Sequence, residues 1–325
     1  MLFNTHQFIF IFLPIILIIY FFTNLRIPKY SYICILLSSI IFYGLWDINF
    51  LILIFISIIV NFQFGSLVKK TGRKLYFVLG IFFQIFILGY FKYKNFFLEN
   101  LNFITNNQFQ IEAIILPLGI SFFTFKHILY LIECYNNDYK KDYSLLNYAT
   151  YITFFPHLIA GPLSKPKEII PQLLKNSPIS FYNFNIGLVI FFIGLFKKII
   201  LADTFASYAT DPFSAVDGGY NISFIESWIA MFCFSFQIYF DFSAYSDMAI
   251  GIGLMFGFIL PVNFNSPYKA LSVIEFWRRW HVTLSSFFRD YIYIPMGGNR
   301  YGIRQQILLL LFVMLLVGFW HGAAW

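Results

Sequence analysis

Long apolar runs without a single charged residue limit most strongly how this chain can fold. Such runs, free of Asp, Glu, Lys and Arg, occupy residues 1–25, 30–46, 48–68, 75–91, 176–196, 248–268 and 305–325. Shorter or interrupted apolar stretches follow at 113–135, 143–164 and 227–241. A helix that crosses a bilayer needs about 20 apolar residues, and in lipid each segment must satisfy its own backbone. The sequence therefore predicts roughly nine or ten hydrophobic helical segments.

The composition agrees with a chain that is surrounded by lipid. Hydrophobic residues make up 59% of the 325 residues, charged residues make up 11%, and the mean hydropathy is +0.73. Because a soluble domain carries about 25% charged residues, this chain has too little charge to cover its surface in water. We predict an all-α, polytopic transmembrane protein that forms a single domain over residues 1–325.

The distribution of charge and cysteine excludes several other classes. The net charge of +7 comes from short basic clusters between apolar runs, as in the cytoplasmic loops of membrane proteins, and this disfavours nucleic-acid binding. Residues 92–112, which are neutral overall, are interpreted as a connecting segment after the run 75–91. Cys34, Cys134 and Cys233 are far apart, so neither a disulfide nor a metal site is predicted.

The final apolar run ends in a polar motif, GFWHGAAW, at residues 318–325. Its His321 is the one type of side chain that can take and return a proton near neutral pH. In an acyl transfer, such a residue could deprotonate a hydroxyl group that attacks a thioester. The alternative is an imidazole that is hydrogen-bonded between helices.

A second cluster, FWRRWHVTLSS, combines tryptophans, Arg278, Arg279 and His281 between two apolar spans. The simpler interpretation is an interfacial amphipathic helix, since Trp and Arg suit the headgroup level of a membrane. The functional interpretation is a basic mouth for the phosphates of a coenzyme, because an Arg side chain can bind two phosphate oxygens at once. Trp280 would belong to this mouth, and His281 would point inward.

A third cluster interrupts the apolar stretch near residue 240. On a helix, Asp241 and Tyr245 share a face, while Asp247 lies on a second face with Ser243. We favour structural support of the site over catalysis or metal binding. The carboxylates are expected to pair with arginines, and the candidates are Arg278, Arg279 and Arg289.

Pro and Gly interrupt two further apolar segments, LPLGISFFTF at 116–125 and FFPHLIAGPL at 154–163. Such residues predict kinked or broken helices, which are tolerated where protein or a cavity satisfies the backbone. His127 and His157 could line such a cavity. The favoured interpretation of both is a structural histidine with satisfied hydrogen bonds.

Taken together, these segments resemble the bacterial branch of the membrane-bound O-acyltransferase (MBOAT) family, and within it the membrane subunits of alginate and peptidoglycan O-acetyltransferases. The resemblance extends over nearly the whole chain. It is carried by the motifs above together with GLFKKIILAD (194–203), QIYFDFSAYSDMAIG (237–251), NFNSPY (263–268) and RDYIYIPMGGNR (289–300).

The resemblance implies a ring of helices around a thin centre, with a catalytic tunnel in which His321 is the central residue. His281 matches a second histidine that assists catalysis or shapes the tunnel. Arg278, Arg279 and Trp280 become candidates for substrate binding, as do Trp320 and Asn265. The implied donor is cytoplasmic acetyl-CoA, with no permanently bound cofactor.

The resemblance also implies partners and a location. The acetyl group would pass to a polysaccharide through an extracytoplasmic Ser-His-Asp acetyltransferase, in a bacterial cytoplasmic membrane. Family members usually continue well beyond the WHG histidine, so the expected domain is truncated at its C-terminus. Three alternatives remain: a D-alanyl transferase for teichoic acids, a transporter or flippase, and an inactive scaffold.

Overall fold

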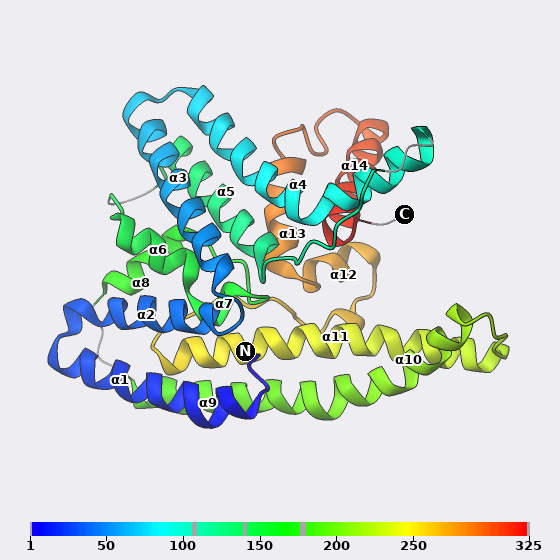
Figure 1. Ribbon diagram of the computed structural model, residues 1–325, viewed down its shortest axis with the longest axis horizontal. Coiled ribbons are helices and arrows are strands. Elements are labelled where there is room, and N and C mark those ends of the chain that lie inside the picture. Colours follow the sequence, from blue (N-terminus) through cyan, green and yellow to red (C-terminus); the bar gives the residue numbers. More distant parts are fainter. Residues whose placement is uncertain (1, 106–108, 139–141, 176–179, 324–325) are drawn as a thin grey trace. The chain divides into compact units, whose positions relative to one another are not determined.

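A computed structural model of the chain describes residues 2–105, 109–138, 142–175 and 180–323 (Figure 1). The ends of some predicted segments and motifs, at 1, 176–179 and 324–325, lie outside these ranges. The described residues form helices and connecting segments without any strand, which confirms the predicted all-α fold. Contacts divide the chain into two units, Met1–Leu53 with Lys141–Asn263, and Ile54–Lys140 with Phe264–Trp325.

The first unit contains helices that pack side by side, among them α9 and α11. Its elements are η1 (Phe8–Phe12), α1 (Leu13–Arg26), η2 (Pro28–Tyr30), α2 (Ser31–Gly44), the start of α3 (Asn49–Thr71), α6 (Leu145–Thr153), α7 (Phe155–Leu158), α8 (Pro166–Leu174), α9 (Phe181–Phe196), η3 (Lys197–Ala202), α10 (Asp203–Asp217) and α11 (Phe224–Met255).

The second unit contains the remaining helices, including those that carry the RRWH and WHG motifs. Its elements are α3 from Ile54 onward, α4 (Lys74–Thr105), α5 (Ile120–Asn136), η4 (Pro267–Lys269), α12 (Val273–Arg279), α13 (Val282–Phe288), η5 (Arg289–Tyr293) and α14 (Ile303–His321).

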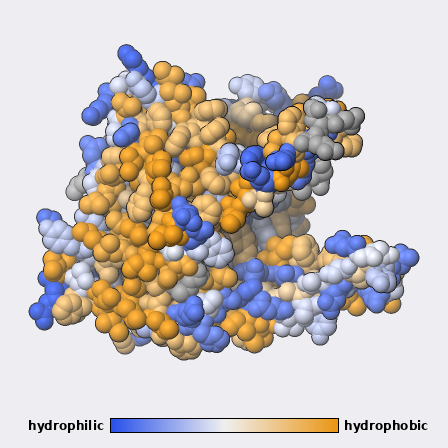
Figure 2. Space-filling view, in the orientation of Figure 1, coloured by the Kyte–Doolittle hydropathy of each residue, from blue (hydrophilic) through white to orange (hydrophobic). Residues whose placement is uncertain are grey.

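Within the described residues, five helical stretches are long and apolar enough to cross a membrane. They are Phe8–Arg26, Asn49–Thr71, Lys74–Thr105, Phe181–Asp217 and Ile303–His321. Many of their exposed side chains are apolar, and Figure 2 shows such side chains over much of the visible face of α1 and α3. These helices agree with a polytopic membrane protein.

Two of the predicted segment boundaries near the carboxylate cluster are wrong. Residues 227–241 and part of 248–268 belong to one helix, α11, which begins at a capping box made by Ser223 and Glu226. The helix ends at Met255, and Gly257 follows with a φ of +83° that favours glycine. Residues 256–266 are therefore not helical, although the apolar run continues through them.

The segment that was expected to end at residue 196 also continues. After α9 the chain forms a π-helical turn, η3, and then α10, so that one helical rod extends along α11 (Figure 1). The charged residues that were expected to end the span are instead paired. Lys197 lies 2.5 Å from Asp247, and Lys198 lies 2.6 Å from Asp241.

The predicted arginine partners of these carboxylates are therefore wrong. Asp241 and Asp247 pair with lysines of the first unit, whereas Arg279 pairs with Glu275 at 2.6 Å. Arg289 pairs with its neighbour Asp290 at 2.8 Å. The lysines reach the carboxylates because η3 packs directly on α11.

Glycines let α9 and α11 approach each other closely. A Cβ atom added to Gly187 would lie 2.6 Å from the carbonyl oxygen of Gly251, and one added to Gly194 would lie 2.8 Å from that of Ala244. Small residues at such positions are typical of helix pairs that pack tightly in membranes.

In the second unit, α4 is longer than the predicted apolar run. It continues to Thr105, so Lys92 and Lys94 lie within a helix and the expected connecting segment begins later. Residues 106–108 of that segment lie outside the described residues.

Candidate active site

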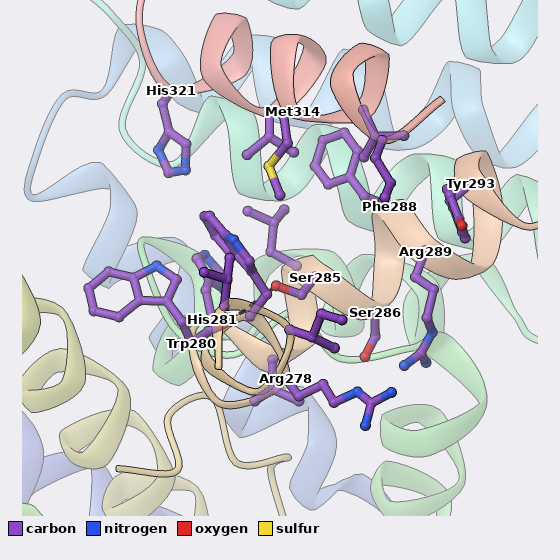
Figure 3. Close-up of a pocket in the computed structure, with 18 of the residues that line it drawn as sticks. Arg278, Trp280, His281, Ser285, Ser286, Phe288, Arg289, Tyr293, Met314 and His321 are labelled. Carbon is purple, nitrogen blue, oxygen red and sulfur yellow. Dashed lines mark hydrogen bonds between the residues drawn. The ribbon is translucent and has the colours of Figure 1, made fainter. Parts of the chain in front are cut away.

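A cavity of about 730 Å³ lies in the second unit, and both histidines of the sequence motifs line it (Figure 3). Its walls come from α12, α13, η5 and one face of α14. Apolar side chains form most of the lining, and a few polar groups are placed among them. The polar and aromatic lining residues include Trp277, Arg278, Trp280, His281, Ser285, Ser286, Arg289, Tyr293, Gln306 and His321.

The short helix α12 is fixed at both ends by local interactions. The Ser272 hydroxyl accepts the Glu275 N–H at 3.2 Å, and the Glu275 carboxylate accepts the Leu271 N–H at 2.8 Å. The Arg279 guanidinium donates two hydrogen bonds to the same carboxylate, at 2.6 and 3.0 Å. The Leu271 N–H, and to a smaller extent Arg279, hold the pKa of Glu275 below its ordinary value.

The two adjacent arginines have different positions. Arg279 donates to the Asn265 carbonyl oxygen at 3.2 Å, and its own carbonyl accepts the Asn265 N–H at 2.9 Å. Arg278 lines the cavity instead. Of the predicted binding residues, Arg278 and Trp280 therefore line the cavity, while Arg279 and Asn265 hold the neighbouring backbone.

His281 occupies the bend between α12 and α13. Its φ of +41° is unusual for a residue with a side chain and costs on the order of 1 kcal/mol, so the surrounding packing must stabilise it. Its side chain is buried, and burial lowers the pKa of His281 to about 3. The imidazole is thus neutral near pH 7, with one N–H donor and one acceptor nitrogen.

His321 is the last residue of α14 and reaches the same cavity. Figure 3 shows its side chain directed from α14 toward the part of the cavity that His281 lines. The structure thus brings the two predicted catalytic histidines together from segments that are 40 residues apart in the sequence. A pair of imidazoles at one cavity can take a proton from an attacking group and return it to a leaving group.

Trp320 was predicted to bind substrate, but it does not line the cavity; its ring contacts that of His321, which does, with centroids 4.6 Å apart. The Trp320 ring centroid lies 5.2 Å from that of Phe125 and 6.3 Å from that of Phe122, both in α5. Phe125 in turn contacts Phe287 of α13 at 4.6 Å. These aromatic contacts connect α14 to α13 and support the positions of both histidines.

The predicted supporting residues Asp241, Tyr245 and Asp247 belong to the first unit. The two carboxylates form the lysine ion pairs described above, and the Tyr245 ring stacks on Phe3 with centroids 4.6 Å apart. Among the residues that the structure describes, no group of three His, Cys, Asp or Glu side chains gathers as a metal site would require.

The structure gives His127 and His157 structural roles, as the sequence favoured. His127 Nε2 lies 3.1 Å from the Ser57 hydroxyl, and its carbonyl accepts from Asn61 Nδ2 at 3.2 Å. His157 is bonded through both ring nitrogens, to the Ser164 hydroxyl at 2.8 Å and to the Tyr151 carbonyl at 3.0 Å. Both imidazoles are fully buried.

Sequence patterns missed several polar residues that line the cavity. Ser285 and Ser286 follow the RRWH motif, while Tyr293 and Gln306 lie further along the chain. Helical spacing from His281 could have indicated Ser285, since residues four apart share a helix face. No comparable signal marks Gln306, which reaches the cavity because α14 forms one of its walls.

Comparison with known proteins identifies the family. The MBOAT, membrane-bound O-acyltransferase family, matches residues 136–325. A peptidoglycan O-acetyltransferase of Helicobacter pylori is 42% identical over 100% of this chain and 67% of its own length. A probable alginate O-acetylase, AlgI, of Pseudomonas aeruginosa is 39% identical over 99% of this chain and 62% of its own length.

A more distant relative, a teichoic acid D-alanyltransferase of Bacillus subtilis, is 28% identical over 64% of this chain and 54% of its own length. The chain thus spans about two thirds of the length of its more similar relatives, or slightly less. The similarity covers the segments that carry His281 and His321, and it confirms the resemblance that the motifs predicted. The chain belongs to the membrane-bound O-acyltransferase family.

Proposed function

We propose that this chain is the membrane subunit of an O-acetyltransferase that takes an acetyl group from acetyl-CoA and passes it across the membrane. The observation that carries the proposal is the cavity in which His281 and His321 meet. Relatives named peptidoglycan O-acetyltransferase and alginate O-acetylase support acetyl as the group that is transferred.

In this proposal His321 is the base. Its imidazole takes the proton of an attacking hydroxyl group while the hydroxyl oxygen bonds to the thioester carbonyl carbon. The carbon–sulfur bond then breaks, the proton passes from the imidazolium to the departing thiolate, and an ester and free CoA thiol result. The neutral imidazole of His281 can donate a hydrogen bond to the oxyanion that forms in between.

The remaining lining suits the donor. Arg278 and Arg289 supply positive charge for the phosphates of the coenzyme, and a guanidinium can bind two phosphate oxygens. The apolar wall from α14, which includes Leu310, Val313 and Val317, offers an apolar surface to the acyl end of the donor.

The acceptor is proposed to be a cell-surface polysaccharide of the peptidoglycan or alginate type. The protein would then lie in a bacterial cytoplasmic membrane and pass the acetyl group to an extracytoplasmic Ser-His-Asp acetyltransferase. The names of the relatives support the polysaccharide class, and the family supports a membrane location.

Transfer from radiolabelled acetyl-CoA tests the proposal. The full-length protein and its His321→Ala variant are compared in membrane vesicles that contain the acceptor polysaccharide and the Ser-His-Asp acetyltransferase of the same cell. We expect acetyl-ester formation by the wild type and none above background by His321→Ala, with equal amounts of both proteins in the membrane. Unchanged ester formation in the variant would contradict the assignment of His321.

A D-alanyl transferase is the second candidate, and the partial similarity to teichoic acid D-alanyltransferases favours it. The same vesicles are therefore supplied with a D-alanyl carrier-protein thioester instead of acetyl-CoA. Transfer from this donor and not from acetyl-CoA would replace the first proposal. Movement of a solute across the vesicle membrane in the absence of both acyl donors would indicate a transporter.

A further inference from the structure

The helix that carries His321 ends against α4, at a place where its own backbone needs partners. The last carbonyl groups of a helix have no partner within the helix. In α14, the Gly318 carbonyl accepts the Gly322 N–H at 3.2 Å. The next two carbonyls, those of Phe319 and Trp320, accept hydrogen bonds from side chains of α4.

Two consecutive residues of α4 supply these donors. The Tyr93 hydroxyl donates to the Phe319 carbonyl oxygen at 2.9 Å, and the Lys92 ammonium donates to the Trp320 carbonyl oxygen. The side chains of the same residues also make contact. The Tyr93 ring stacks on Phe319 with centroids 4.4 Å apart and an interplanar angle of 18°, while the Lys92 ammonium lies 5.3 Å from the Trp320 ring centroid.

The charge of Lys92 suits this position. A helix carries partial negative charge at its C-terminal end, so a cation there is stabilising. The Tyr93 side chain is buried and Lys92 is partly buried, so water competes little for the two carbonyls. The end of α14 is thus held by a cation, a hydroxyl group and two ring contacts, all from one turn of α4.

We propose that Lys92 and Tyr93 are positioning residues that cap α14 and thereby fix the imidazole of His321 in the cavity. The inference rests on the proposed function, because it takes His321 as the base. Neither Lys92 nor Tyr93 lines the cavity, and both donate to the backbone carbonyls of the two residues that precede His321. Figure 3 shows His321 at the end of α14, so loss of the cap would displace this residue most directly.

The activity test uses variants that remove only the donor groups. Lys92→Met keeps the length of the side chain and Tyr93→Phe keeps the ring that stacks on Phe319. We expect each to lower kcat for acetyl transfer about 10-fold, and the double variant about 100-fold, because small displacements of a catalytic group have effects of this size. KM for acetyl-CoA should stay within about twofold, and Lys92→Arg, which retains a cationic donor, should recover most of the loss.

The same helix offers matched controls. Lys94 lies two residues from Lys92 and its ammonium is 5.3 Å from the ring centroid of the exposed Tyr90. Lys94→Met and Tyr90→Phe remove the same groups from α4 without touching α14, and we expect wild-type kcat from both. A loss in the controls equal to that in Lys92→Met would overturn the proposal, because the effect would then be general to α4.

Hydrogen exchange of the purified full-length protein tests the cap without using activity. In a peptide that covers residues 315–323, we expect faster amide exchange in Lys92→Met and Tyr93→Phe than in the wild type and the two controls. Unchanged exchange would overturn the proposal, and so would faster exchange with unchanged kcat. A raised KM at constant kcat would also overturn it, because Lys92 would then contact the donor.

The two proposals fail separately in these experiments. Retained transfer by His321→Ala would contradict the proposed function and with it the catalytic purpose of the cap. The exchange measurement would still show whether α4 holds the end of α14. Inactive His321→Ala together with fully active Lys92→Met and Tyr93→Phe would reject the positioning role alone.

Discussion

The ammonium group of Lys197 lies 2.5 Å from the carboxylate of Asp247 and joins the π-helical turn η3 to α11. Beside it, the Lys198 ammonium contacts Asp203 at 2.8 Å and Asp241 at 2.6 Å. Charged groups within apolar helices are tolerated when they pair with one another. These contacts explain why helical structure continues through the charged residues in both the η3 segment and α11.

Breaking this pair on one side should destabilise the protein more than replacing both partners. We expect Asp247→Asn to lower the free energy of unfolding by about 1–3 kcal/mol. This loss is smaller than the loss for a fully buried ion pair, because both side chains are about one quarter exposed. The double variant Lys197→Met with Asp247→Met should lie closer to the wild type. Thermal unfolding in detergent measures the difference, and equal losses in the single and double variants would contradict the pairing argument.

Larger residues at the α9–α11 contact should separate these helices. Gly187→Ala places a Cβ atom 2.6 Å from the Gly251 carbonyl oxygen, and we expect it to cost about 1–3 kcal/mol. Gly89→Ala in α4 is the control, since no heavy atom lies within 4 Å of the added Cβ. Thermal unfolding should show a lower Tm for Gly187→Ala only, and an equal Tm for both would show that α9 and α11 are not tightly packed.

The adjacent arginines should have separable effects. Arg278 lines the cavity, so we expect Arg278→Ala to raise KM for acetyl-CoA about 10-fold, the loss of one charge-assisted contact to phosphate. Arg279 holds Asn265 and Glu275, so Arg279→Ala should change KM less and lower the Tm instead. Steady-state kinetics and thermal unfolding of the two variants decide this, and the reverse pattern would exchange the two assignments.

The pH dependence of transfer should not report titration of His281. Its pKa is lowered to about 3, so the side chain gains a proton only below that pH and stays neutral from about pH 5.5 to 8. We expect His281→Gln to lower kcat about 100-fold or less while the shape of the pH profile in this range stays the same. Loss of an inflection in the variant would show that His281 itself changes protonation in this range.

Much of the fold could be predicted because its physical cause is local. Backbone groups in lipid must pair within their own segment, so charge-free runs such as 48–68 and 305–325 predict helices directly. The positions of α3 and α14 agree with these runs within a few residues. The motif around His321 was likewise recognisable, since it comprises only neighbouring residues.

The errors around η3 and α11 share one cause, which is pairing between segments that are distant in the sequence. The lysines of the GLFKK motif were expected to end a span, and the carboxylates of α11 were expected to need arginines. In the sequence, the lysines and the carboxylates each interrupt an apolar run. In the structure, their charges neutralise each other across the contact between η3 and α11. No local pattern contains this information.

The candidate site also has a part that local sequence predicts and a part that depends on packing between segments. The sequence by itself singled out His281 and His321 as the candidates for catalysis, because one histidine ends a charge-free run and the other follows two arginines. Only the tertiary structure decided that Arg278 faces the cavity and Arg279 does not, and that Lys92 and Tyr93 hold the end of α14. The direction of a side chain and the partner of a helix end depend on packing between segments, which no single segment encodes.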